Sequence, residues 1–158
     1  MYPESPTVSD FVLISLIAGT VGAIAMYFTM RLINISGWAK GDMLLALGSM
    51  ALNRRENAFF VGTVIHWVSS IIFAFLYLLV LSKTGCLHFP AALFGGAFLG
   101  GLQGFFVSLA LVWVATDRHP LEEFRNADLP IGVMHLVGHI AFGATVGFII
   151  GLWTLRQG

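Results

Sequence analysis

Charged residues are scarce in this chain of 158 residues: 10% of it is charged, whereas 58% is hydrophobic. So few charged side chains cannot cover the surface of a water-soluble domain. Eight basic residues balance eight acidic ones, so the chain has no net positive charge with which to recruit a nucleic acid. The composition therefore predicts an integral membrane protein that is surrounded by membrane lipids and binds no nucleic acid.

Cysteine is almost absent, and several catalytic signatures are missing. Cys86 stands alone, so the chain has no internal disulfide, and neither a CxxC nor an HExxH motif occurs. No serine or cysteine stands at a recognisable spacing from a histidine and an acid. The apolar runs have no central charged residue of the kind that marks a proton or ion pathway. We therefore expect a protein that is not an enzyme.

Four apolar runs are long enough to cross about 30 Å of hydrocarbon at the helical rise of about 1.5 Å per residue. They cover residues 11–33, 58–81, 90–115 and 131–155. The acidic N-terminal segment MYPESPTVSD lacks the basic residues of a signal peptide, so the first run should remain in the mature protein. We predict an all-α fold in which residues 1–158 form one domain, a bundle of four transmembrane helices.

A shorter apolar run, MLLALGSMAL, follows the first span and is too short to cross a membrane. Asp42 stands before it as an N-cap, and Asn53 stands at its end. We predict a short helix that lies at the membrane interface between the first two spans. The alternative is a re-entrant segment that lines a cavity.

Basic residues predict the topology. The first and third loops hold six of the eight, whereas the termini and the second loop hold only Lys83 and Arg156. The excess of basic residues marks the cytoplasmic side, so we expect loops one and three in the cytoplasm and both termini outside. We interpret the third loop, TDRHPLEEFRNADLP, as a solvated connector in which Pro120 can begin one helical turn; the alternative is a docking motif.

Glycines recur every four residues in the last two spans and form two stripes of small residues. Small residues at this spacing let the backbones of two membrane helices approach closely. The stripes predict that the third and fourth spans pack on each other, or that one stripe faces another subunit. The packing residues are Gly96, Gly100, Gly104, Gly143, Gly147 and Gly151.

Three histidines lie inside the spans: His66 in the second, and His135 and His139 in the fourth. His66 and His139 both lie about 12 Å from the cytoplasmic ends of their helices, so the three rings could meet at one depth. Imidazoles are costly in hydrocarbon and require an explanation. Three remain open: axial ligation of a b-type haem by His66 and His139, a copper or zinc site made by all three, or neutral rings that hydrogen-bond across helices. The hydrogen-bond partners expected in the last case are Gln103, Thr63, Ser69, Tyr27 and backbone carbonyls.

Three short motifs suggest a relationship to known proteins. The first span carries G-x-x-x-A-x-x-M, with Gly19 or Gly22 followed by Ala25 and Met26 to Met30. The second carries His66-Trp67-Val68, and the last carries His135-Leu136-Val137-Gly138-His139. In these motifs the chain resembles a family of small bacterial four-helix membrane proteins of unknown function. The resemblance implies a four-helix fold in a bacterial inner membrane and implies no activity.

The sequence thus leaves three hypotheses for function. The first is a non-catalytic subunit that packs against other integral membrane subunits of a larger complex of energy metabolism. The reason for a subunit role is that the chain has little mass outside the membrane. The second is an electron-transfer anchor that binds haem b or a metal through His66, His139 and His135. The third is a carrier for a small molecule or a lipid, which predicts a cavity beside the histidines.

Overall fold

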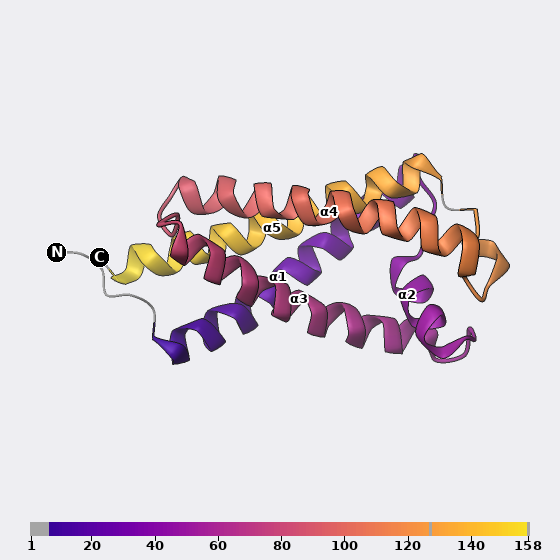
Figure 1. The fold of residues 1–158 in the computed structure, drawn as a ribbon, viewed down its shortest axis with the longest axis horizontal. Coiled ribbons are helices and arrows are strands. Elements are labelled where there is room, and N and C mark those ends of the chain that lie inside the picture. The colour runs from indigo at the N-terminus through magenta and orange to yellow at the C-terminus, as the bar shows by residue number, and fades with distance from the viewer. Residues whose placement is uncertain (1–6, 127, 158) are drawn as a thin grey trace.

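The computed structural model of the chain describes residues 7–126 and 128–157. These residues form five α-helices and one 3-10 turn and contain no strand, so the predicted all-α class is confirmed. The elements are α1 (Val8–Ile35), α2 (Met43–Leu52), α3 (Ala58–Lys83), α4 (Ala91–Arg118), the turn η1 (Glu122–Phe124) and α5 (Leu129–Gln157) (Figure 1).

Four of the helices, α1, α3, α4 and α5, are long and apolar enough to cross a membrane, as the sequence predicts. They begin and end within three residues of the predicted spans. All four are longer than predicted because each helix continues through polar residues beyond the apolar run. Lys83 and Arg118, for example, each end one of the helices.

Helix α5 lies at the centre of the bundle, with α4 along one side and α1 along another (Figure 1). Helix α1 crosses α3 at Gly19, where an added Cβ would lie 2.6 Å from the Cα of Ile71. By contrast, α3 and α4 make few contacts with each other. They lie close at the end where residues 84–90 join them and diverge toward the other end, where α2 lies between them (Figure 1).

Helix α2 begins and ends where the sequence predicts. The Asp42 side chain accepts a hydrogen bond from the backbone N–H of Leu45 at 3.0 Å, and Asn53 ends the helix in the left-handed conformation with φ 55°. Gly48 of α2 and Gly62 of α3 lie at their contact, because a Cβ on either would fall on a backbone carbonyl of the other helix. This contact fixes α2 against the start of α3.

The glycine stripes are occupied by contacts within the chain. Gly96, Gly100 and Gly104 face α5, and Gly143 and Gly147 face α4, at distances that leave no room for a side chain. A Cβ on Gly96 would lie 2.9 Å from the Cα of Gly147, and one on Gly143 would lie 2.9 Å from the backbone nitrogen of Gly100. Gly151 lies instead against the ring of Phe89, which precedes α4. The glycines of α4 therefore anchor it to α5.

Candidate functional site

A cavity of about 740 Å³ lies where α3 and α4 diverge. Residues of α3 and α4 form its two sides, α1 and α5 contribute further wall residues, and α2 closes the end of the bundle at which it lies. Most of the lining is apolar, including Met43, Met50, Phe73, Val107 and Phe142. Sites for small molecules commonly have volumes of about 300–1,000 Å³ and mainly apolar walls. Both the size and the lining therefore suit a lipid-soluble ligand.

The three histidines of the spans line this same cavity. His66 comes from α3, and His135 and His139 come from successive turns of α5. His139 lies one helical turn beyond His135 on α5. The structure thus brings the three predicted site residues together, although two helices far apart in sequence supply them. We refer to them as the histidine cluster.

One nitrogen of His66 is already engaged. Its Nε2 lies 3.3 Å from the backbone carbonyl oxygen of Ala23 in α1, and because a carbonyl only accepts, Nε2 must carry the proton. The neighbouring Trp67 also contacts α1, since its indole N–H donates to Oγ1 of Thr20 at 2.9 Å. Trp67 therefore ties α3 to α1, which accounts for its position away from the ends of the span.

The two histidines of α5 are buried with hydrogen-bonding capacity to spare. The Nδ1–H of His135 donates to the carbonyl oxygen of Ile131 at 2.9 Å, but its Nε2 has no partner. Nδ1 of His139 is also buried without a partner, and among the described side chains only Ser15 Oγ shares this state. A buried polar atom left unsatisfied costs about 1–3 kcal/mol. Both residues line the same cavity, so their two unpartnered nitrogens are candidate ligand contacts.

Two of the polar groups expected to serve the histidines, Gln103 and Thr63, have partners elsewhere. The hydroxyl of Tyr77 donates to Oε1 of Gln103, and the hydroxyl of Thr63 donates to the carbonyl of Phe59 at 2.8 Å in its own helix. The backbone carbonyls of Ala23 and Ile131 are the partners that the histidines use. Of the partners expected from the sequence, backbone carbonyls are those seen to hydrogen-bond to the histidines of the cluster.

The geometry of the cluster bears on the metal and haem hypotheses. Within residues 7–126 and 128–157, no group of three His, Cys, Asp or Glu residues is arranged to hold a metal ion. The copper or zinc site therefore gains no support. For haem, Nε2 of His66 already donates to a carbonyl, which leaves Nδ1 of that ring for the iron. His135, rather than His139, has the arrangement usual for a ligand, with Nδ1–H bonded to a carbonyl and Nε2 free.

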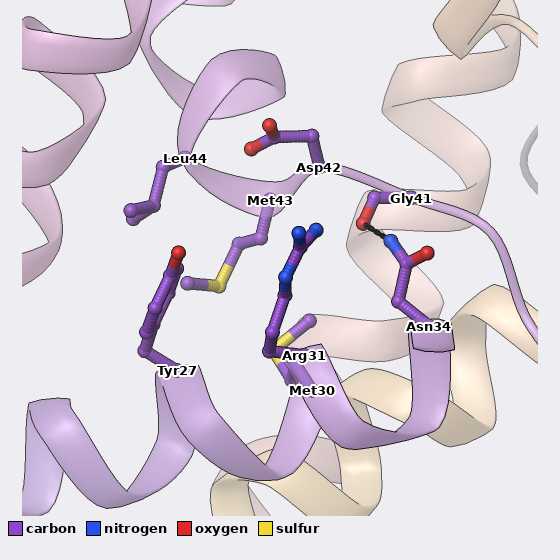
Figure 2. Close-up of a pocket in the computed structure, with 8 residues that line it drawn as sticks. All are labelled: Tyr27, Met30, Arg31, Asn34, Gly41, Asp42, Met43 and Leu44. Carbon is purple, nitrogen blue, oxygen red and sulfur yellow. Dashed lines mark hydrogen bonds between the residues drawn. The ribbon is translucent and has the colours of Figure 1, made fainter. Parts of the chain in front are cut away.

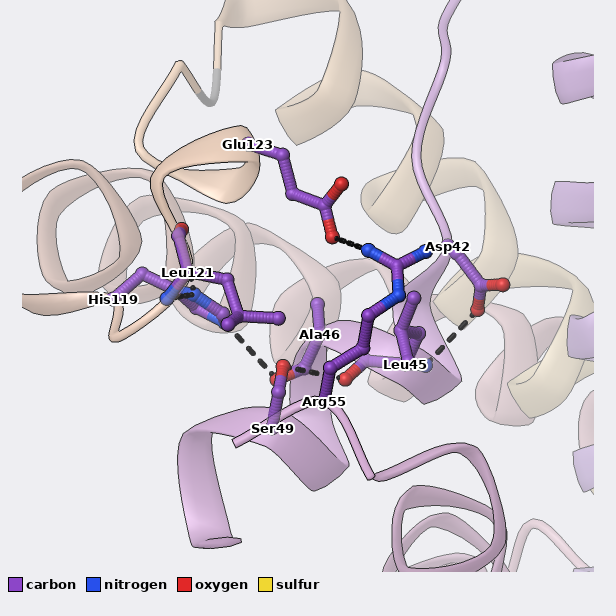
Figure 3. Close-up of polar contacts among 8 residues, drawn as sticks. All are labelled: Asp42, Leu45, Ala46, Ser49, Arg55, His119, Leu121 and Glu123. Atoms are coloured by element: carbon purple, nitrogen blue, oxygen red, sulfur yellow. Dashed lines mark hydrogen bonds and ion pairs between the residues drawn. The ribbon is translucent and has the colours of Figure 1, made fainter. Parts of the chain in front are cut away.

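A second buried histidine site lies at the α2 end of the cavity (Figure 3). His119, the residue after α4, is only 1% exposed. Its Nδ1 accepts from the N–H of Leu121 at 3.1 Å, and its Nε2–H donates to the carbonyl of Ala46 in α2, also at 3.1 Å. The ring of Phe124 packs edge-on against the imidazole, with the centroids 4.8 Å apart. These contacts fasten the third loop to α2.

The prediction that the third loop is simply a solvated connector is therefore wrong. Besides His119, an exposed ion pair joins Arg55, between α2 and α3, to Glu123 of η1 (Figure 3). The predicted turn after Pro120 is present as η1, and Phe124 lines the cavity. No sequence pattern indicated this contact, because His119 stands among charged residues in the most polar part of the chain.

The α2 end of the cavity is polar. A small pocket of about 40 Å³ lies beside the end of α1, lined among others by Tyr27, Arg31 and Asn34 (Figure 2). The amide of Asn34 donates to the carbonyl of Gly41 at 2.8 Å, which fastens the segment before α2 to α1. Asn34 and Gly41 line both this pocket and the large cavity.

Charged residues of the same end also line the large cavity: Lys40, Asp42, Arg55 and Glu123. The cavity is therefore amphipathic, with charged groups near α2, apolar walls, and the histidine cluster about two helical turns from the start of α3 and of α5.

No protein-family model, curated protein or solved structure matches this chain, so its function must be inferred from this geometry.

Proposed function

We propose that this protein is a membrane-embedded binding protein or carrier for a lipid-soluble small molecule or lipid. The observation that carries the proposal is the cavity of about 740 Å³ between α3 and α4, with the histidine cluster in its wall. Burial of apolar surface contributes about 25 cal/mol per Å², so walls such as Phe73, Val107 and Phe142 favour an apolar ligand. The imidazoles supply the few polar groups that orient it.

The charge distribution argues against ions as the cargo. The charged residues that line the cavity all lie near α2, and none accompanies the histidines in the middle of the spans. Ion pathways across membranes usually carry Asp, Glu, Lys or Arg there, and the middle of these spans has none of the four. A neutral or amphipathic molecule fits better, with its apolar part among the side chains of α3 and α4.

The proposal is tested by a bulky substitution that takes up space inside the cavity. Val107 lines the cavity from α4, whereas Leu109 on the same helix is 56% exposed on the outer surface of the bundle. Val107→Trp should place a bulky ring inside the cavity and narrow it, and Leu109→Trp should add the same ring outside it. Each variant is purified in a mild detergent from its own membranes, and mass spectrometry of the organic extract identifies small molecules retained with the chain.

We expect wild type and Leu109→Trp to retain one molecule in stoichiometric amount and Val107→Trp to lose it. The molecule, added back, should raise the melting temperature of the first two proteins and leave Val107→Trp unchanged. If the wild type carries nothing beyond bulk lipid, or if Val107→Trp retains the same molecule as Leu109→Trp, the cavity is not a binding site.

A subunit of a larger membrane complex is a second candidate, and the outer face of α4 favours it. Only 11% of the apolar part of α4 is buried, against 50% of that of α5. Its outer face exposes five aromatic side chains: Phe94, Phe98, Phe105, Phe106 and Trp113. Native mass spectrometry tests this candidate, because a subunit should be found in a larger assembly that Phe98→Ala with Phe106→Ala weakens. A chain found only alone would eliminate it.

For topology, we propose that α2 and the third loop face the cytoplasm of a bacterial inner membrane, with α2 at the interface. The six basic residues of loops one and three support this orientation, and the family resemblance supports the bacterial membrane. The single cysteine, Cys86, lies between α3 and α4 and should face outward. A membrane-impermeant maleimide should label Cys86 in intact cells and should not label Cys86→Ser/Arg54→Cys until the cells are opened. The opposite pattern would invert the topology.

A further inference from the structure

We infer that the ligand of the cavity is an amphipathic molecule with a hydroxyl group, which hydrogen-bonds to His135 and His139. This inference rests on the proposed function and specifies the chemistry of the ligand. It follows from which hydrogen bonds the two imidazoles already make and which they lack.

The hydrogen bond that His135 already makes determines which kind of ligand group its other nitrogen can bind. Its Nδ1 lies 2.9 Å from the carbonyl oxygen of Ile131, so Nδ1 carries the proton. A charged imidazole is costly inside a membrane, and in the neutral ring Nε2 is then an acceptor. Nε2 is buried without a partner in a side chain that is only 4% exposed. The missing partner must therefore be a donor.

His139 adds a second requirement. Its Nδ1 is also buried without a partner, one helical turn from His135 on α5. No described group bonds to this Nδ1, so it can carry a proton and present an N–H. A hydroxyl oxygen donates one hydrogen bond and accepts others, so a single hydroxyl serves both rings. Ethers, ketones and carboxylates cannot donate to His135, and an ammonium cannot accept from His139.

The rest of the wall indicates what carries the hydroxyl. The two histidines share the cavity with apolar side chains from all five helices, including Met26, Phe73 and Phe142. A molecule that leaves its apolar body among these side chains and places one neutral hydroxyl at the histidines uses both parts of the surface. Lipid-soluble alcohols, phenols and quinols have this chemistry.

A matched pair of probes tests the inference: 4-octylphenol, which has the hydroxyl, and 4-octylanisole, which replaces it with a methyl ether. Binding is measured by isothermal titration in detergent for wild type, His135→Leu and His88→Leu. His88 is an exposed histidine outside the cavity and serves as the control. One hydrogen bond to a buried acceptor corresponds to a difference of about tenfold in affinity.

We expect wild type and His88→Leu to bind the phenol about tenfold more tightly than the ether, and His135→Leu to bind both equally. The comparison of the two probes on wild type needs no variant, so a poorly folded His135→Leu would not obscure the result. Equal binding of phenol and ether by wild type would overturn the inference but leave the cavity as a binding site. If neither probe binds, both the inference and the proposed function fail. A Soret band in the purified protein that His135→Leu abolishes would assign Nε2 to haem iron instead of a hydroxyl.

Discussion

Two neighbouring glycines of α4 allow the contact between α4 and α5 to be measured directly. A Cβ on Gly100 would fall on the carbonyl of His139, 3.0 Å from its carbon, and would lie 3.1 Å from the Cα of Gly143. A Cβ on Gly101 would meet only the side chain of Ile140, at 3.6 Å, which is an ordinary contact. Gly100→Ala and Gly101→Ala therefore make the same chemical change at adjacent positions, one against the backbone of α5 and one against a side chain of α5.

Backbone atoms cannot rotate away as a side chain can, so Gly100→Ala must push α4 and α5 apart. A gap of about 0.5–1 Å forfeits about a quarter to a half of the dispersion energy of each atom pair. Overpacking of this kind costs about 1–3 kcal/mol. Alanine in place of glycine inside a helix contributes about 0.5–1 kcal/mol of stability where space is free. We expect Gly100→Ala to be destabilised by a net amount of up to about 2.5 kcal/mol, and Gly101→Ala to be equal to wild type or slightly more stable.

The assay is reversible unfolding in mixed micelles of a mild detergent and increasing dodecyl sulfate. Tryptophan fluorescence follows the transition, since Trp113 of α4 and Trp153 of α5 report on the two helices. Because α4 forms one side of the cavity, Gly100→Ala should also weaken binding of the retained molecule. Equal stabilities for Gly100→Ala and Gly101→Ala would refute the close backbone contact between α4 and α5.

Two further predictions concern buried polar contacts. Tyr77→Phe should lower the free energy of unfolding by about 1–3 kcal/mol, because the amide oxygen of Gln103 loses its donor. The double variant Tyr77→Phe with Gln103→Leu should recover part of that loss, because it leaves no unpaired amide. A double variant less stable than Tyr77→Phe would contradict this reasoning. His119→Ala should release the third loop from α2, so trypsin should cleave after Arg125 faster than in wild type. An unchanged rate of cleavage would mean that this histidine does not hold the loop.

The helices could be predicted because local sequence determines them. A run of about twenty apolar residues must form a helix in lipid, where every backbone polar group needs an internal partner. The boundaries of α2 were equally local, since Asp42 accepts a hydrogen bond from its first turn and Asn53 adopts the conformation that ends it. The meeting of the three histidines was expected from helical rise alone, because His66 and His139 lie at similar distances from the starts of α3 and α5.

The cavity and the attachment of the third loop could not be predicted in the same way. The cavity exists because α3 and α4 diverge and α2 lies between them, which depends on how whole helices cross. The carrier hypothesis required such a space, but no residue pattern indicated it. His119 was missed because its burial depends on α2, whose carbonyl at Ala46 lies 73 positions away in the chain. Contacts over such separations leave no local periodicity.

The four-residue repeat of α5 explains how one helix both binds α4 and lines the cavity. Four residues advance an α-helix by about 400°, so each step of the repeat turns about 40° further around the axis. Between His135 and Gly151 the stripe therefore turns through about 160°. Its start lines the cavity at His135, its middle lies against α4 at Gly143 and Gly147, and its end reaches Phe89 beyond the start of α4. The histidines thus come to the cavity because the glycines that follow them hold α4, and a ligand bound at His135 and His139 would contact a wall whose position those glycines determine.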